Sequence, residues 1–324
     1  MPSRCLASFL LAASLLLSQN PTIRTTVPIV VLPTSVTDRH GQPVSGLKAD
    51  DFELIDNGQR KPVKIDIVDS QLPPIALVVL VQTTANALSA LAKICKEGAL
   101  LSQGVVGENG EVAVISFDDE VRVRANFTNN VNTVSDVFRS LKPNDATHAR
   151  LLDALERGLT LLEARQSAGR SSLLLIGESR DRGSQVHLAD LQQRLQRAQA
   201  TVYSMHYSVY LTPFTIRPEE YEPTGGGYID GIRDLVRLSR ENTMDSLTKL
   251  TGGMNLRFQT RSKLEKDLMR LSADIHNRYA VSFIPDREAS PSLHALSLRV
   301  KGRPELSVLT RAGYWSLPSD SNAK

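Results

Sequence analysis

The sequence predicts an α/β protein with a doubly wound, mostly parallel sheet. Residues 75–81 and 172–176 are continuous apolar runs, which are typical of strands buried on both faces of a parallel sheet. Amphipathic helical patterns at 131–141, 151–162 and 188–198 lie between or after such runs. Because strand and helix alternate along the chain, we expect parallel strands with helices on both faces of the sheet.

A β-rich stretch precedes the first buried strand. Between residues 25 and 71, short apolar segments alternate with turns, one of them at Asn57 and Gly58. Pro73 and Pro74 then form a stiff connection. We therefore expect a small N-terminal β module over 25–71 and a main domain over 72–316.

The rest of the main domain continues the alternation. Further strands are expected at 111–117, 120–127, 201–206, 278–284 and 293–300, and further helices from Leu88 onward, at 242–250 and at 264–276. Residues 207–240 are rich in Pro, Tyr and Gly, which indicates an irregular insertion. Residues 317–324 are expected to form a disordered tail.

The first residues predict export. Arg4 is followed by a short apolar run that ends at Leu17, which is the build of a secretory signal peptide over residues 1–20. The mature protein would then be periplasmic or extracellular. An uncleaved anchor or a misassigned start codon is the alternative. Removal of this segment leaves Cys95 alone, so no intramolecular disulfide is expected.

The composition and the charge pattern bear on whether the partner is a nucleic acid or a membrane. The chain is 41% hydrophobic and 23% charged, with a net charge of +3, as in ordinary soluble proteins. Basic and acidic residues are interspersed, and aromatic residues make up only 5% of the chain. This pattern does not indicate a nucleic-acid partner. No membrane span is expected beyond the signal segment.

Oxygen-bearing side chains follow the predicted strands in three loops. They are Gln82, Thr84 and Asn86 in the first loop, Asp145 and Thr147 beside His148 in the second, and Glu178 and Asp181 in the third. Ligands of open α/β sheets collect at the carboxyl ends of the strands. We therefore expect these loops to meet in one site.

These loops and their spacing resemble a von Willebrand factor type A domain. The motifs that carry the resemblance are the first buried strand with its turn, Thr147 followed by Leu151-Leu-Asp-Ala-Leu, Asp181-Arg-Gly-Ser, Leu250-Thr-Gly-Gly and Tyr279-Ala-Val-Ser-Phe-Ile-Pro. The closest likeness is to a secreted bacterial group, of acidobacterial type, with a short β module in front and a Tyr-Trp tail. The resemblance implies a Rossmann-like fold for most of the chain.

In that family the three loops form a metal-ion-dependent adhesion site, whose first loop is Asp-x-Ser-x-Ser. The family's first Asp falls on Gln82, its two Ser on Thr84 and Asn86, its Thr on Thr147 and its last Asp on Glu178. Loss of the first carboxylate weakens a site that holds a divalent cation by charge. Bound Mg²⁺ or Mn²⁺ is one alternative; a degenerate site that holds no cofactor is the one we favour.

Other residues are also candidates for parts of a site. Asp118 and Asp119 could compensate for the lost charge, or they could cap helices and form turns. Asp145, His148 and Asp181, with Tyr221 and Tyr228 in the insertion, are candidates for contact with a partner. The sequence contains no nucleophile elbow, zinc-protease motif or phosphate-binding loop, so we expect no enzyme.

These observations favour a non-enzymatic, exported adhesion or interaction module whose partner is another protein. A scaffold subunit that binds through 207–231 without metal is an alternative. A hydrolase on an α/β frame is a remote one, because no pair of nucleophile and base is visible.

Overall fold

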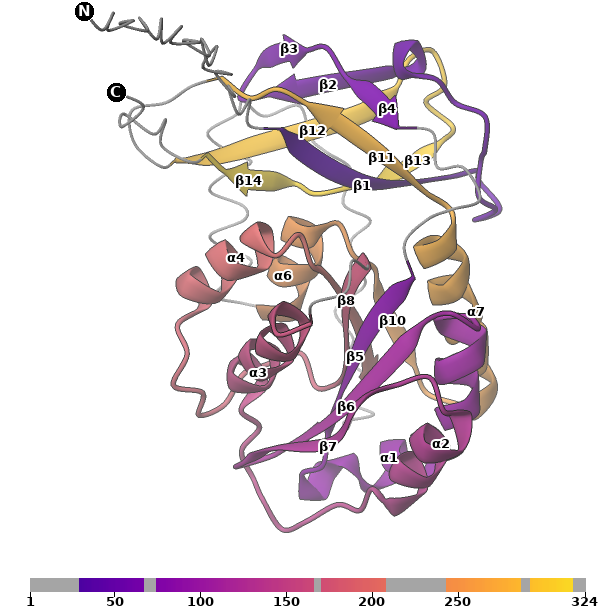
Figure 1. The fold of residues 1–324 in the computed structure, drawn as a ribbon, viewed down its shortest axis with the longest axis vertical. Coiled ribbons are helices and arrows are strands. Elements are labelled where there is room, and N and C mark those ends of the chain that lie inside the picture. Colours follow the sequence, from indigo (N-terminus) through magenta and orange to yellow (C-terminus); the bar gives the residue numbers. More distant parts are fainter. Residues whose placement is uncertain (1–28, 67–73, 166–169, 208–242, 287–291, 317–324) are drawn as a thin grey trace, which may run out of the picture.

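The computed structural model describes residues 29–66, 74–165, 170–207, 243–286 and 292–316. Within them the chain forms an α/β layer with a smaller β-sandwich stacked against one end (Figure 1). The predicted signal peptide, nearly all of the insertion and the C-terminal tail lie outside the described residues.

The α/β layer is built on a six-stranded sheet with the order β10-β9-β8-β5-β6-β7. Its strands are β5 (Ile75–Gln82), β6 (Glu111–Phe117), β7 (Val121–Thr128), β8 (Arg170–Gly177), β9 (Thr201–Tyr207) and β10 (Asn255–Phe258). All neighbouring pairs are parallel except β6 and β7, which form an antiparallel pair. The predicted doubly wound, mostly parallel sheet is therefore confirmed.

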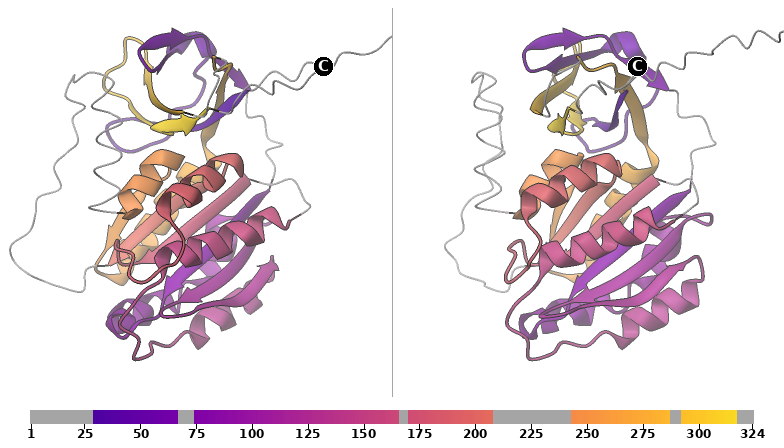
Figure 2. Two further views of the ribbon diagram at one scale, coloured as in Figure 1. Left: turned by 90° about the vertical axis from the view of Figure 1, so that its left-hand side faces the viewer. Right: turned by 60° about the vertical axis from the view of Figure 1, so that its left-hand side comes forward.

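Helices cover both faces of this sheet (Figure 2). One face packs against α1 (Leu88–Ile94), the π-helical turn η3 (Leu100–Val105), α2 (Val131–Ser140) and α7 (Arg261–His276). The other face packs against α3 (Leu151–Glu163), α4 (Leu188–Arg197) and α6 (Thr243–Thr251). None of the helices in the described part of the chain is long and apolar enough to cross a membrane.

Strand β5 lies at the centre of both cores. Every residue from Ile75 to Gln82 is buried, because β8 and β6 flank the strand and helices cover both faces of the sheet. Alternate side chains point to opposite faces: Leu77 and Val79 join the core under α1 and α7, and Val78 joins the core under α3. The continuous apolar run is the consequence of this double burial.

The β-sandwich contains strands from both ends of the described chain. One sheet has the order β13-β1-β11-β4 and the other β14-β12-β2-β3. The strands are β1 (Val30–Thr37), β2 (Phe52–Asp56), β3 (Gln59–Lys61), β4 (Lys64–Asp66), β11 (Arg278–Phe283), β12 (Leu293–Val300), β13 (Ser307–Leu309) and β14 (Gly313–Trp315). The α/β layer is thus inserted between β4 and β11.

This pairing differs from the division expected from sequence, which places the last strands with the main domain. In the structure β11 and β13 flank β1, and β12 pairs with β2. The physical reason is the core between the two sheets, where Leu32 and Phe52 from the N-terminal strands pack with Val281 and Leu298 from the C-terminal strands. Neither set of strands has a complete apolar partner face without the other.

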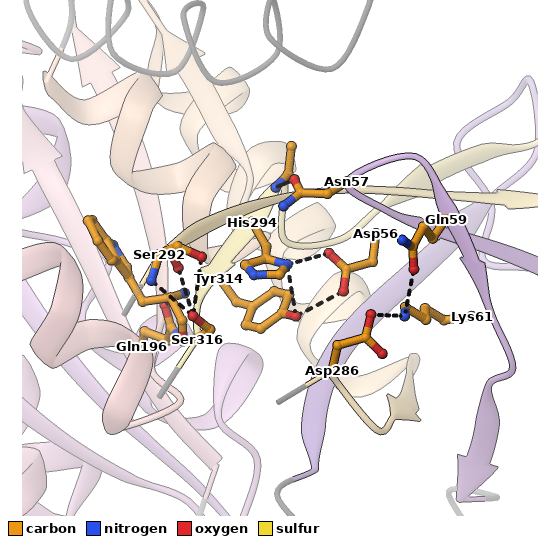
Figure 3. A network of polar contacts seen from close by, with 12 residues as sticks. Asp56, Asn57, Gln59, Lys61, Gln196, Asp286, Ser292, His294, Tyr314 and Ser316 are labelled. Atoms are coloured by element: carbon orange, nitrogen blue, oxygen red, sulfur yellow. Dashed lines mark hydrogen bonds and ion pairs between the residues drawn. The ribbon is translucent and has the colours of Figure 1, made fainter. Parts of the chain in front are cut away.

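A buried polar network ties the two ends of the chain together within the sandwich (Figure 3). His294 Nδ1 on β12 lies 2.7 Å from Asp56 Oδ1 on β2, and the Tyr314 hydroxyl on β14 donates to Asp56 Oδ2 at 2.9 Å. All three side chains are buried, so each polar atom of the carboxylate needs such a partner. The network therefore joins β2, β12 and β14.

The sandwich lies at the amino ends of the strands of the α/β sheet (Figure 1). It is attached there by Gln196 on α4, whose Nε2 donates to the Trp315 carbonyl oxygen at 2.5 Å and whose Oε1 accepts from the Trp315 amide (Figure 3). The carboxyl ends of β5, β6 and β8 lie at the opposite end of the molecule. The three candidate loops are therefore not covered by the sandwich.

Candidate functional site

The first and second loops are joined by main-chain hydrogen bonds. The Asn144 amide donates to the Thr83 carbonyl at 2.9 Å, and the Ala85 amide donates to the Ala146 carbonyl at 3.2 Å. The second loop, which connects α2 to α3, therefore lies along the turn that follows β5. Because these bonds use backbone groups, they hold the loops together whatever side chains they carry.

Gln82 joins the first loop to the third. Its side chain is only 2% exposed. Its Oε1 accepts a hydrogen bond from the Glu178 backbone amide at 2.8 Å, and its Nε2 donates to Thr84 Oγ1 at 2.8 Å. A backbone N–H only donates, so the amide oxygen must face Glu178 and the NH₂ group must face Thr84.

Gly177 makes room for this amide. A Cβ atom at Gly177 would lie 2.8 Å from Gln82 Oε1 and 3.1 Å from Gln82 Cβ. These distances are below normal carbon contacts, so a side chain here would displace Gln82 from its position. The small residue at the end of β8 and the long amide at the end of β5 are therefore complementary in shape.

Asp118, directly after β6, is the centre of a second buried network. Its Oδ2 accepts from Thr83 Oγ1, Asn144 Nδ2 and Arg122 Nη1, each at 2.8 Å, and its Oδ1 accepts from the Glu120 amide at 3.0 Å. Burial alone would raise the pKa of Asp118, but the Glu120 amide, the Thr83 hydroxyl and the Arg122 guanidinium outweigh it and lower that pKa below its usual value. The carboxylate is thus charged and fully paired.

Asp181 ties the third loop to the start of α3. Its Oδ1 accepts from the Leu152 amide at 3.1 Å and from Ser184 Oγ at 2.5 Å. In the opposite direction, Asp153 Oδ1 accepts from the Gln185 amide at 2.9 Å. The first amides of a helix lack partners within the helix, and here a carboxylate from another loop supplies one.

The surface above these networks is formed by exposed side chains from the first two loops. Asn86, Asp145, Thr147 and His148 are exposed, and Leu88 at the start of α1 is 63% exposed. Thr147 Oγ1 contacts His148 Nδ1, its neighbour in the chain, at 3.2 Å. The result is a polar surface with one large apolar side chain.

The structure brings the sequence-predicted residues together in part. Gln82, Thr84 and the backbone of Glu178 form one hydrogen-bonded unit. The first loop also carries Asn86. The second loop, which is joined to the first by main-chain hydrogen bonds, carries Asp145, Thr147 and His148. Asp181 belongs to the third loop and caps α3. Tyr221 and Tyr228 lie outside the described residues.

The oxygen atoms of these side chains do not form a set of ligands that fits a divalent cation. Mg²⁺ requires about six oxygen ligands in near-octahedral geometry. Here the Gln82 oxygen accepts the Glu178 N–H group, the Thr84 oxygen accepts an N–H group of Gln82, and the Gln82 side chain carries no negative charge. Asp118 already has a cationic partner in Arg122. The described residues contain no group of three or more His, Cys, Asp or Glu side chains that could hold a metal ion.

Arg122 is the site residue that sequence reasoning missed. It lies on β7, antiparallel to β6, four positions after Asp118. The alternation of Arg122 and Arg124 with apolar residues in this strand was the available signal, since it indicates a strand with one charged face. That signal does not reveal which acidic residue Arg122 would pair with.

The structure also contains one serine–histidine contact within the described residues of β9. Ser204 Oγ lies 2.7 Å from His206 Nε2. Ser204 has no exposed surface, and its hydroxyl donates to Asn255 Oδ1 at 3.0 Å. A nucleophile must reach its substrate, so this buried pair lacks the geometry of a hydrolase centre.

No family model and no curated protein matches the sequence. Among solved structures, an aerotolerance-related membrane protein from Bacteroides fragilis is 11% identical over 62% of this chain and 99% of that chain, with a TM-score of 0.43. A von Willebrand factor type A protein from Catenulispora acidiphila is 10% identical over 92% of this chain and 76% of that chain, also with a TM-score of 0.43. At such identities the likeness concerns the fold alone.

The strand order of the sheet and the helices on both of its faces agree with the Rossmann-like fold that the resemblance to von Willebrand factor type A domains implies.

Proposed function

We propose that this protein is a non-enzymatic, exported interaction module that binds a partner protein through the loops at the carboxyl edge of its sheet, without a divalent cation. The observation that carries the proposal is the preformed loop surface. Three loops are bound to one another by Gln82, Asp118 and Asp181, while Asn86 and Leu88 remain exposed above them.

Preorganisation supports binding by such a surface. Ordering a mobile loop on association costs free energy, and this cost reduces the affinity that the interface provides. Here the hydrogen bonds within and between the loops already hold the backbone, so that cost falls on folding instead. An exposed leucine within a polar rim is also the composition expected of a protein contact.

Metal independence follows from charge and hydrogen bonding at Gln82. In the related adhesion sites a carboxylate at this position attracts the cation. In this chain a neutral amide bridges Thr84 and Glu178, so the loops are held together by N–H groups in the place where a cation would bridge oxygens. We therefore propose that a chelator leaves partner binding intact.

Export is proposed from the first residues of the sequence. Arg4 and the apolar run that ends at Leu17 support a signal peptide, and a partner in the cell envelope or outside the cell would follow from it.

The test is partner capture from a cell-envelope extract with purified protein and chemical cross-linking. We expect Leu88→Asp to abolish capture, and EDTA to leave it unchanged. Met269→Asp is the matched control, because Met269 on α7 is 66% exposed, close to the 63% of Leu88, and lies outside the loops. Capture that survives Leu88→Asp but is lost on deletion of 207–231 would instead support the scaffold alternative.

A further inference from the structure

Three arginines meet where the α/β layer contacts the sandwich, at the end of the sheet opposite to the loop surface. Arg170 begins β8, Arg278 begins β11, and Arg311 lies between β13 and β14. Burial, together with the charge of Arg278, lowers the pKa of Arg170 and lowers that of Arg311 to about 10. The positive charge of Arg278 is therefore felt by both of the other arginines.

Asp274 is the carboxylate that pairs with Arg278. Asp274 Oδ2 accepts from Arg278 Nε at 2.9 Å and from Arg278 Nη2 at 2.5 Å, and also from the Tyr203 hydroxyl at 3.0 Å. Arg278 Nη2 donates in addition to the Gly252 carbonyl at 2.7 Å. Asp274 thus balances one positive charge of the three.

Arg311 is buried with part of its guanidinium group unpaired. It is only 3% exposed, yet its Nε and Nη2 atoms make no hydrogen bond to any described residue, and Arg278 Nη1 also lacks one. The backbone of Arg311 is held against the turn after α6, where a Cβ on Gly252 would lie 2.8 Å from the Arg311 nitrogen. The chain therefore holds this side chain inside the junction instead of releasing it to solvent.

A buried, unpaired guanidinium is strongly unfavourable, because Arg cannot lose its proton near neutral pH. Nε and Nη2 form one edge of the guanidinium group, with two parallel N–H bonds that match two oxygens of one anion. We propose that Arg311 binds a small oxyanion at this junction, with Arg278 Nη1 as the next unpaired donor of the cluster.

Thermal melting at constant ionic strength tests this proposal, with sulfate or phosphate replacing chloride. At about ten times its dissociation constant, the oxyanion should raise the melting temperature of the wild type by about 3 °C. Arg303→Met is the matched control and should show the same rise, because Arg303 is exposed and pairs with nearby Glu305. Arg311→Met should show no rise.

An equal rise in all three proteins would overturn the proposal, since sulfate and phosphate also stabilise proteins by exclusion from their surface. Equal melting temperatures of the wild type in chloride and in sulfate or phosphate would overturn the assignment to an oxyanion.

A crystallographic measurement on the wild type keeps the proposal testable if Arg311→Met does not fold. Selenate is an anomalous scatterer that resembles sulfate. We expect its anomalous peak within hydrogen-bond distance of Arg311 Nε and Nη2 in crystals grown with selenate. Ordered water alone at these atoms would contradict the proposal, because water would then satisfy the two donors.

Discussion

At the scale of single residues, Gln82 joins two of the loops that form the loop surface. Its neutral side chain offers one acceptor to the Glu178 amide and one donor to Thr84. A carboxylate at this position could accept from the Glu178 amide but could not donate to Thr84.

Gln82→Leu tests this role. The substitution nearly keeps the volume but leaves the Glu178 amide and the Thr84 hydroxyl without their partner, so we expect the free energy of unfolding to fall by about 2 to 3 kcal/mol. Urea denaturation measures the change. Asn86→Ala, at an exposed position of the same loop, should change it by less than about 0.5 kcal/mol. Equal stability of Gln82→Leu and the wild type would show that the bridge contributes nothing.

The buried carboxylate of Asp118 should give stability a specific acid dependence. Its pKa is lowered in the folded state from the ordinary value of 3.8, so its contribution to stability is present above that value and is lost as the pH falls through the folded-state pKa. We expect Asp118→Asn to lower stability by about 2 kcal/mol at pH 7, since Arg122 loses its buried partner and keeps only Glu120. The difference from the wild type, followed by urea denaturation, should shrink as the pH falls below 3.8. A difference that stays constant through this range would contradict the assignment.

At the scale of elements, sequence patterns predict those whose signal is local. The apolar runs of β5 and β8 and the amphipathic stripes of α2 and α3 are each visible within a short window of sequence. Strand β10 is not predicted, because four residues between two helices are too few for a period-two pattern to stand out. The pairing of β1 with β11 is not predicted either, since it joins segments that are distant in the sequence.

The same distinction applies to the candidate site. That the loops after β5 and β8 meet can be inferred from the rule that parallel strands end at one edge. That both polar atoms of the Gln82 side chain are hydrogen-bonded cannot be inferred, because it depends on the direction of one side chain and on a backbone amide of another loop. The role of Asp181 as a helix cap could not be predicted from the sequence for a similar reason: its partner, Leu152, lies on a helix 29 residues away in sequence.

Asp181→Ala tests the link between the third loop and α3. Loss of an N-terminal cap costs about 1 to 2 kcal/mol, and the effect should be concentrated at the start of the helix. We expect faster hydrogen exchange at the Leu152 amide, with little change at the end of α3. Asp136→Ala is the control, since Asp136 pairs with Arg139 on the exposed surface of α2. Uniform acceleration along α3 would indicate global unfolding instead.

At the scale of the whole molecule, the chain is arranged as one domain inserted into another. The sandwich is formed by strands that precede and strands that follow the α/β layer in the sequence. Gln196 on α4 binds both the amide and the carbonyl of Trp315 on β14, as a neighbouring strand would. The loop surface lies at the far end of the sheet (Figure 1). The sandwich and the loop surface therefore lie at opposite ends of the molecule.

Trp315 is the single tryptophan of the chain, so its fluorescence reports on the sandwich. We expect fluorescence and far-UV circular dichroism to show one common unfolding transition in the wild type. Gln196→Ala removes both bonds to Trp315, and the fluorescence transition should then precede the dichroism transition. Coincident transitions in the variant would mean that other contacts of the junction couple the two units.

Whether the loop surface needs a cation is tested most directly by Mn²⁺ titration followed by NMR. Bound Mn²⁺ broadens the resonances of nearby amides. We predict no saturable broadening at Thr84 or Glu178 at millimolar Mn²⁺, because a neutral amide that is hydrogen-bonded at both ends stands at Gln82, where the related adhesion sites have a carboxylate. Saturable broadening centred on these residues, and abolished by Glu178→Ala, would contradict a loop surface held together by hydrogen bonds alone.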